Sequence, residues 1–288
     1  MGSASARGSD HIVSRLPLSW TEPGRRLASV VVEASGYSAV EEEHRAMESA
    51  GARVLATMCA PSEGRVRCES IVDLGGLDPR ELESRLRSMK GIGSAEVREG
   101  AVRGFASLPG RTLESAGTRS ILMTSRALRG MLLGMREFLG EEVGETALYY
   151  VGYYSGRGAA QEHDELLGPG AAPRVNFAVL QAHGYASSIE ALRSPDGSRY
   201  RIEARDLVEC DLLKGRMRGR TSHWFRGMLA GILEASEGGE WDVEEVECVN
   251  DGSDKCAFEA RRRAPGPPAP RGTIDISGQR GTLPQIGR

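Results

Sequence analysis

Residues 222–256 run SHWFRGMLAGILEASEGGEWDVEEVECVNDGSDKC, and this stretch decides the fold of the second half of the chain. Its first part, up to about Glu237, predicts a helix. The segments 241–249 and 255–262 predict two strands, and the residues between them, Asn250 to Asp254, are typical of a hairpin turn. We therefore expect a helix and then a closing hairpin.

Three possible metal ligands lie in this hairpin, namely Glu245, Cys248 and Cys256. Glu245 and Cys248 are three residues apart, so ideal pleating points them to opposite faces of the strand. Both can reach one ion only if a bulge or twist intervenes. Zn²⁺ usually takes four N, S or O ligands in a tetrahedron. The alternative is that both cysteines are core thiols, since cysteine is among the most buried residue types.

Residues 118–263 form the second of two expected domains. Apolar residues at helical spacing begin near Thr118, and a further helix is expected over about 143–160. Gly152 and Gly156 fall on one face of that helix and allow another backbone to approach closely. A helix ending near Gly184, a strand, and a second strand over 198–206 follow.

Residues 26–104 predict a first domain with the element order βαββαβ. The expected strands are 27–33, 52–60, 65–74 and 93–99, and the expected helices are 38–50 and 79–89. This order gives an antiparallel sheet with two helices on one face, a ferredoxin-like arrangement. The fold class of the whole chain is therefore α+β.

The first domain resembles the ACT domain, a regulatory module that often binds amino acids and often dimerises. The resemblance rests on the element order and on Gly36 in the loop after the first strand. It implies a possible amino-acid ligand and a homodimer. A plain dimerisation or scaffold domain is the alternative, because fold alone does not imply function.

The remaining segments lack regular patterns. Residues 1–25 predict a flexible arm and 105–117 a linker, and the Pro/Gly-rich stretch 264–288 predicts a disordered tail.

Composition excludes several classes of protein. Among the 288 residues, 27% are charged and the net charge is −3, so no basic surface for direct nucleic-acid binding is expected. No apolar run reaches the ~20 residues that span a bilayer, and the N-terminal residues lack the apolar core of a secretory signal. Five cysteines argue against a disulfide scaffold and for a reducing compartment, with metal binding or simple burial as their uses. We expect a cytoplasmic protein without a membrane partner.

Three segments together resemble the 4-vinyl-reductase-like (4VR) domain. They are ALYYVGYYSG (147–156), SHWFRGMLAGILEA (222–235) and VEEVECVNDGSDKCAFE (243–259). The family includes a bacteriochlorophyll-biosynthesis protein and the aromatic-sensing domains of phenol- and xylene-responsive regulators. The resemblance implies an α/β fold related to trafficking-complex subunits, with a pocket for a hydrophobic small molecule, often next to a zinc site.

The family's zinc site takes a Cys at the start of a helix, then a Glu and two Cys. Glu245, Cys248 and Cys256 match the last three positions, whereas the first falls on Ser222, a poor zinc ligand. We expect the neighbouring His223 to substitute and to complete a structural zinc site. Cys210 is another possible donor. His223 could equally be an ordinary helix-start histidine.

Aromatic residues make up only 5% of the chain, and several of them fall in the matching segments. A ligand pocket lined by them is expected, although each could equally be a packing residue. The candidate ligand-binding residues are Tyr149, Tyr153, Phe177, Trp224 and Phe225.

The predicted function is small-molecule sensing by a hydrophobic or aromatic ligand in the C-terminal domain. No dinucleotide fingerprint, P-loop or nucleophile elbow is present, so we expect a binding module and not an enzyme. One alternative is an enzyme or accessory factor in tetrapyrrole (chlorophyll-type) vinyl reduction. Another is a non-catalytic dimeric interaction module.

Overall fold

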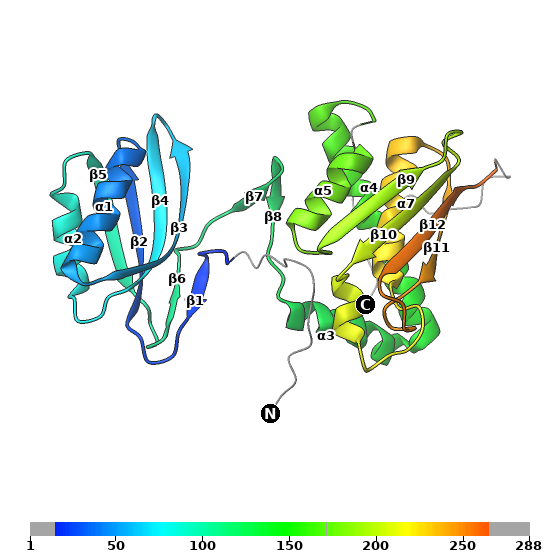
Figure 1. Cartoon of the computed structure of the whole chain (residues 1–288), viewed down its shortest axis with the longest axis horizontal. Coiled ribbons are helices and arrows are strands. Elements are labelled where there is room, and N and C mark those ends of the chain that lie inside the picture. The colour runs from blue at the N-terminus through cyan, green and yellow to red at the C-terminus, as the bar shows by residue number, and fades with distance from the viewer. Residues whose placement is uncertain (1–14, 171, 265–288) are drawn as a thin grey trace, which may run out of the picture. The chain divides into compact units, whose positions relative to one another are not determined.

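The computed structural model describes residues 15–170 and 172–264 (Figure 1). The chain divides into two compact units, Met1–Thr112 and Leu113–Arg288. The expected arm and tail lie mostly outside the described residues. Among the described residues, no helix combines the length and the apolar character that a bilayer crossing requires.

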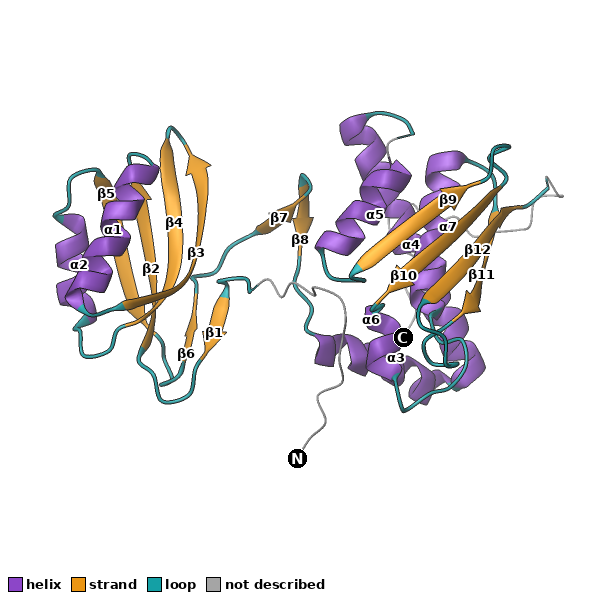
Figure 2. Cartoon of the chain, viewed as in Figure 1, coloured by secondary structure: helices purple, strands orange, loops and turns teal. Residues whose placement is uncertain are grey.

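The first unit has the predicted βαββαβ order. Its strands form one antiparallel sheet in the order β3-β4-β2-β5, and both helices lie on the same face of it (Figure 2). The six elements are β2 (Leu27–Ala34), α1 (Tyr37–Ala50), β3 (Arg53–Ser62), β4 (Arg65–Asp73), α2 (Pro79–Arg87) and β5 (Ile92–Glu99). The narrower likeness to an ACT domain stays a prediction.

Local sequence explains the ends of both helices. The Asp78 carboxylate accepts hydrogen bonds from the backbone N–H groups of Arg80 and Glu81, and Pro79 occupies the first helical position of α2. Gly51 ends α1 in a left-handed conformation with φ 99°, which glycine adopts without a steric penalty. Both helices then bury their apolar sides against the alternate residues of β2 and β4.

The expected arm and linker contribute a short pair of strands to the first unit. β1 (Ser19–Thr21) pairs antiparallel with β6 (Phe105–Ser107). Nearby apolar residues, among them Leu108, pack with Leu27 and Ile71, which are fully buried. The sequence could not predict this pairing because strands of three residues carry no measurable period.

Two of the five cysteines are used in a way that the sequence did not predict. Cys59 and Cys68 are directly opposed in the β3–β4 ladder and form a disulfide. The expectation that every cysteine serves metal binding or simple burial is therefore wrong for this pair. Cys210, Cys248 and Cys256, all in the second unit, are free and buried.

The second unit also contains one four-stranded antiparallel sheet, in the order β11-β12-β10-β9. Helices α4, α5 and α7 lie on one face of this sheet (Figure 2). The elements are β7 (Leu113–Ser115), β8 (Thr118–Ser120), α3 (Ser125–Leu139), α4 (Glu141–Leu167), α5 (Ala172–Ala182), β9 (Ser188–Arg193), β10 (Arg199–Arg205), α6 (Val208–Leu213), α7 (His223–Glu237), β11 (Trp241–Glu247) and β12 (Cys256–Arg262).

Four glycines let α4 and α7 pack backbone to backbone. A Cβ on Gly152 would overlap the carbonyl oxygen of Trp224, and one on Gly156 would overlap that of Met228. Gly227 and Gly231 of α7 lie equally close to carbonyl groups of α4. The close approach predicted from Gly152 and Gly156 is confirmed.

Gly152→Ala should destabilise the second unit by about 1–3 kcal/mol, because its methyl group overlaps backbone that cannot move alone. Gly130→Ala on α3 is the matched control, since a Cβ there meets nothing within 4 Å. The control should leave stability unchanged or raise it by up to about 1 kcal/mol. Calorimetric unfolding of both variants checks this, and equal transition temperatures would contradict it.

Glu43 is a buried carboxyl in the core of the first unit. Its side chain is 1% exposed, and neither carboxylate oxygen has a hydrogen-bond partner among the described residues. The imidazole of His44 lies beside it, with Nε2 3.4 Å from Oε2 of Glu43, and burial lowers the pKa of His44. Burial raises the pKa of Glu43 to about 7.

This raised pKa predicts a first unit that loses stability as pH rises. The folded form keeps the Glu43 proton above the pKa of the unfolded chain, so the stabilisation is complete below about pH 4.5 and is lost through about pH 7. The expected loss is about 3 kcal/mol.

Glu43→Gln should flatten the pH profile of unfolding free energy between these limits, as measured by urea denaturation. Glu42→Gln, at an exposed position of the same helix, is the control and should leave the profile unchanged. Identical profiles for the two variants would refute the assignment.

Candidate metal centre and the adjacent groove

Four buried ligand groups meet at one end of the second unit's sheet. Cys210 comes from α6, Glu245 from β11, Cys248 from the turn after it, and Cys256 from the start of β12. Their ligand atoms all lie within 4.8 Å of one another. The Sγ atom of Cys210 lies 3.5 Å from those of Cys248 and Cys256 and 4.0 Å from Oε1 of Glu245.

A β-bulge makes this cluster possible. The register of the β11–β12 ladder shifts between Glu245 and Glu247, which leaves Val246 as the extra residue. Glu245 and Cys248 therefore face the same interior, where they are 4% and 0% exposed. The irregularity that the odd spacing demanded is present at the expected place.

The structure replaces His223 by Cys210 as the fourth possible ligand. The imidazole of His223 lies away from the cluster, and its Nε2 lies 3.0 Å from Oε1 of Glu145 on α4. His223 begins α7, whereas α6 carries Cys210 into the cluster from the other side. The described cluster thus contains Cys210, the alternative donor, and does not contain His223.

Ser222 supports the cluster as a hydrogen-bond donor. Its backbone N–H and its hydroxyl donate to the two carboxylate oxygens of Glu245, at 3.0 and 2.6 Å. The Thr221 hydroxyl donates to Cys210 Sγ at 3.6 Å, and the backbone N–H of Asn250 donates to Cys248 Sγ at 3.5 Å. Such contacts orient ligands and stabilise their negative charge.

Protonation of the cluster reflects burial and mutual contact. Burial raises the pKa of Glu245 to about 8. Hydrogen bonds from neighbouring thiols lower the pKa of Cys248, and the same contacts raise the pKa of Cys210. Cys248 is consequently the first thiol to ionise, and a bound cation would favour ionisation of all of them.

The donor set fits Zn²⁺. Three thiolates and one carboxylate are ligands that zinc accepts. Tetrahedral Zn–S bonds of about 2.3 Å place two sulfurs about 3.8 Å apart, and the sulfur separations here are 3.5, 3.5 and 4.0 Å. The cluster could hold a metal with Cys210, Glu245, Cys248 and Cys256 as its four ligands.

Glu209, beside Cys210, was missed by sequence reasoning. Its buried carboxylate accepts hydrogen bonds from the backbone N–H groups of Trp224 and Phe225, at 3.0 and 2.8 Å. It therefore caps the first turn of α7 from α6. Burial raises its pKa to about 7. No motif marks this role, because the cap and the helix are 15 residues apart.

A groove of about 460 Å³ lies beside the start of α7, among residues of α4, α7, β11 and the segment after β12. Its aromatic lining residues are Tyr149, Tyr150, Tyr153 and Trp241, its acidic ones are Glu142, Glu145, Glu234, Glu240 and Asp242, and the others include His223, Arg226 and Arg263. The groove thus combines aromatic side chains with an excess of carboxylates.

Polar contacts fix several of these side chains. The Tyr153 hydroxyl donates to Oε1 of Glu234 at 2.5 Å, and burial together with this bond raises the pKa of Tyr153 to about 12. The Arg226 guanidinium lies over the ring of Tyr149, 5.1 Å from its centroid. Burial lowers the pKa of His223 to about 4, so its imidazole is neutral at pH 7.

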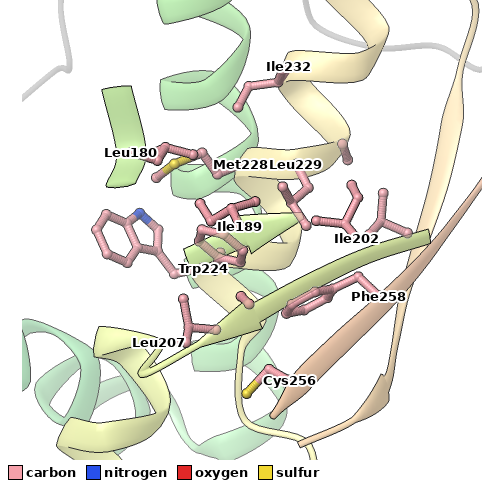
Figure 3. Packing of buried hydrophobic residues seen from close by; sticks show 14 of the residues in the cluster. Leu180, Ile189, Ile202, Leu207, Trp224, Met228, Leu229, Ile232, Cys256 and Phe258 are labelled. Carbon is pink, nitrogen blue, oxygen red and sulfur yellow. The ribbon is translucent and has the colours of Figure 1, made fainter. Parts of the chain in front are cut away.

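The five predicted ligand-binding residues divide between the groove and the core. Tyr149 and Tyr153 line the groove. Phe177, Trp224 and Phe225 are 7%, 8% and 1% exposed and belong to the core around α7. Figure 3 shows Trp224 among other buried side chains of this core. There Trp224 packs on Tyr185 and Phe225 on Phe258.

No protein-family model matches the sequence, and no curated protein matches it. Solved structures show limited likeness. The phenol-responsive sensory domain of the transcription activator PoxR, solved with phenol, is 19% identical over 51% of this chain and 78% of that chain, with a TM-score of 0.45.

Two further structures match at lower scores. A vinyl-4-reductase family protein from Methanocaldococcus jannaschii is 21% identical over 50% of this chain and 85% of that chain, with a TM-score of 0.36. A trafficking protein particle complex subunit 3 from Naegleria fowleri, covalently bound to palmitic acid, is 16% identical over 49% and 95%, with a TM-score of 0.37. Likeness at this level fixes neither a ligand nor an activity.

Cys210→Ser should lower zinc affinity more than about 100-fold, which exceeds the usual effect of changing an outer contact. His223→Gln is the control and should retain one zinc per chain, because His223 contacts Glu145 and not the cluster. Elemental analysis and competition with a chromogenic chelator measure both. Zinc loss in His223→Gln with retention in Cys210→Ser would reverse the assignment.

Proposed function

We propose that the second unit is a small-molecule-binding sensory module whose groove is held in shape by a structural zinc ion. One observation carries the proposal. Glu245, a possible zinc ligand, also accepts hydrogen bonds from the backbone N–H and the hydroxyl of Ser222. The next residue, His223, begins α7 and lines the groove. Metal binding and groove shape thus depend on the same carboxylate.

The ligand set supports a structural role for the metal. Structural zinc sites use four protein ligands, whereas catalytic sites keep one position open for water or substrate. Here four protein donors are within reach, and all four side chains are buried. The proposed role of this unit is therefore binding and not catalysis.

The groove favours a small aromatic ligand without a negative charge. Tyr149, Tyr150 and Trp241 line the groove with aromatic surface that an aromatic molecule can contact. Five carboxylates face two guanidiniums in the lining, and His223 is neutral at pH 7. A neutral hydroxyl or a cationic amine can bond to these carboxylates, whereas an anion is repelled.

Other expectations from the sequence stay proposals. They are a homodimer, an amino-acid ligand of the first unit and a cytoplasmic location. The alternatives, vinyl reduction in tetrapyrrole metabolism and a purely structural interaction module, have no specific support from the groove or the cluster.

Three probes with one ring and different charges test the proposed ligand class: benzylamine, phenol and benzoate. Benzylamine and phenol should bind the zinc-loaded protein at least about tenfold more tightly than benzoate. Chemical-shift titration of the full chain measures this. Equal affinity for all three, or preference for benzoate, would refute the proposed ligand class.

Tyr149→Ala should weaken phenol binding about tenfold through loss of one ring contact. Phe138→Ala, which removes an 88% exposed ring outside the groove, is the matched control. Removal of zinc with a chelator should weaken phenol binding in wild-type protein as well. Unchanged binding by zinc-free protein that remains folded would separate the groove from the metal and overturn the proposed link.

A further inference from the structure

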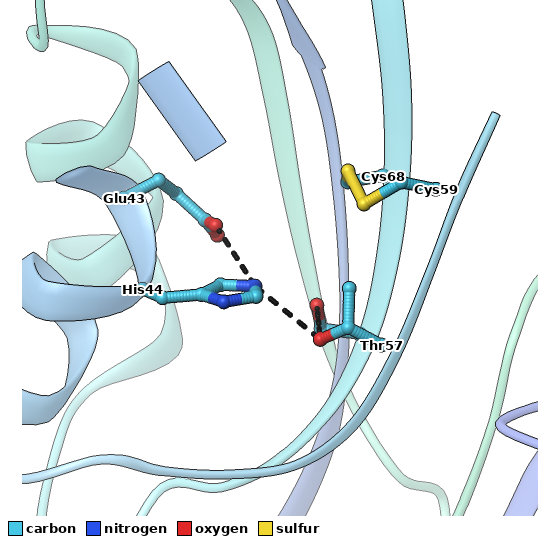
Figure 4. Close-up of a disulfide and its surroundings, with 6 residues drawn as sticks. Glu43, His44, Thr57, Cys59 and Cys68 are labelled. Carbon is cyan, nitrogen blue, oxygen red and sulfur yellow. Dashed lines mark hydrogen bonds and ion pairs between the residues drawn. A yellow bond between two sulfur atoms is a disulfide. The ribbon is translucent and has the colours of Figure 1, made fainter. Parts of the chain in front are cut away.

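The disulfide of the first unit joins a half-buried cysteine to a fully buried one. Cys59 lies half-buried on β3, which is an edge strand of its sheet. Its partner Cys68 lies on β4, inside the sheet, and is 1% exposed. Figure 4 shows both cysteines near the side of the sheet that faces α1.

This disulfide is poorly placed to brace the fold. A disulfide stabilises chiefly by restricting the unfolded chain, and the effect grows with the length of the loop that it closes. Cys59 and Cys68 are only nine residues apart and already face each other in the β3–β4 ladder. The hairpin therefore holds the two residues together without a covalent bond.

Polar side chains lie next to the disulfide on the same face of the sheet. Thr57 and Ser70 form the pair two residues along the ladder, and their hydroxyl oxygens are 2.8 Å apart. Thr57 Oγ1 also lies 3.3 Å from Nε2 of His44 (Figure 4). Beyond it lies Glu43, whose buried oxygens have no hydrogen-bond partner among the described residues. The hydroxyl, imidazole and carboxylate groups at this interface can accept hydrogen bonds from the two thiols that reduction produces.

We propose that Cys59–Cys68 is a thiol–disulfide exchange site that accepts two electrons from a dithiol reductant. Exchange requires access for the attacking thiolate, so the attack falls on Cys59 from the open edge of β3. A bond forms between the reductant's sulfur and Cys59 Sγ, and the bond between Cys59 and Cys68 breaks. Cys68 leaves with the electron pair and takes up a proton.

The second thiol of the reductant completes the reaction. After losing its proton, the second thiol attacks the reductant's first sulfur, which is bonded to Cys59 in the mixed disulfide. Cys59 is displaced as a thiolate and takes up a proton. The reductant becomes a disulfide, and the protein gains two electrons and two protons. Reduction by this route leaves the β3–β4 ladder in place, so the unit stays folded in both states.

Peptide mapping of the full chain tests the site directly. Trypsin places Cys59 and Cys68 on separate peptides, residues 54–65 and 68–80. After treatment of the native protein with diamide, we expect the two peptides to be linked. After native treatment with dithiothreitol, we expect both to be alkylated, and re-oxidation should restore the link. Absence of the link after oxidation, or reduction only in denaturant, would overturn the proposal.

Single-cysteine variants test the direction of attack. Cys68→Ser leaves Cys59 free, and Cys59→Ser leaves Cys68 free. Oxidised glutathione should modify Cys59 in the first variant at least about tenfold faster than Cys68 in the second, as measured by mass spectrometry of the native proteins. Circular dichroism verifies that both variants are folded. Equal rates, or faster modification of Cys68, would overturn the proposed attack at Cys59.

Discussion

The backbone contact between α4 and α7 constrains the second unit most strongly. Gly152 and Gly156 of α4 and Gly227 and Gly231 of α7 leave no room for a side chain between the two helices. This contact fixes where α7 begins. Around that point α6, β11 and the turn after it place the side chains that hold the first turn of α7 and the possible metal ligands.

Two carboxylates serve the start of α7 from different directions. Glu209 of α6 accepts hydrogen bonds from Trp224 and Phe225, and Glu245 of β11 accepts them from Ser222. Both carboxylates have a raised pKa because both are buried. Cys210 is the next residue of α6. The same short helix therefore places both the carboxylate that caps α7 and one of the possible metal ligands.

Sequence reasoning succeeded where spacing alone determines geometry. The spacing of Gly152 and Gly156 indicated a close helix contact, which is present. The odd interval between Glu245 and Cys248 required a bulge or a twist for both to reach one ion, and the ladder contains a bulge there. It failed where tertiary placement decides. His223 is adjacent to Ser222 in sequence, yet α6 brings Cys210 into the cluster instead. Likewise, nothing in the sequence separates the aromatic residues of the groove from those of the core.

The order of the possible metal ligands along the chain has a consequence for how the chain matures. The possible ligands lie at positions 210, 245, 248 and 256, and the last of them opens the final strand of the unit. During synthesis, α3, α4 and α5 emerge before any of these ligands, and a complete set exists only once β12 has been made. An ion that needs all four ligands can therefore bind only after β12 has been made, which is late in synthesis of the unit.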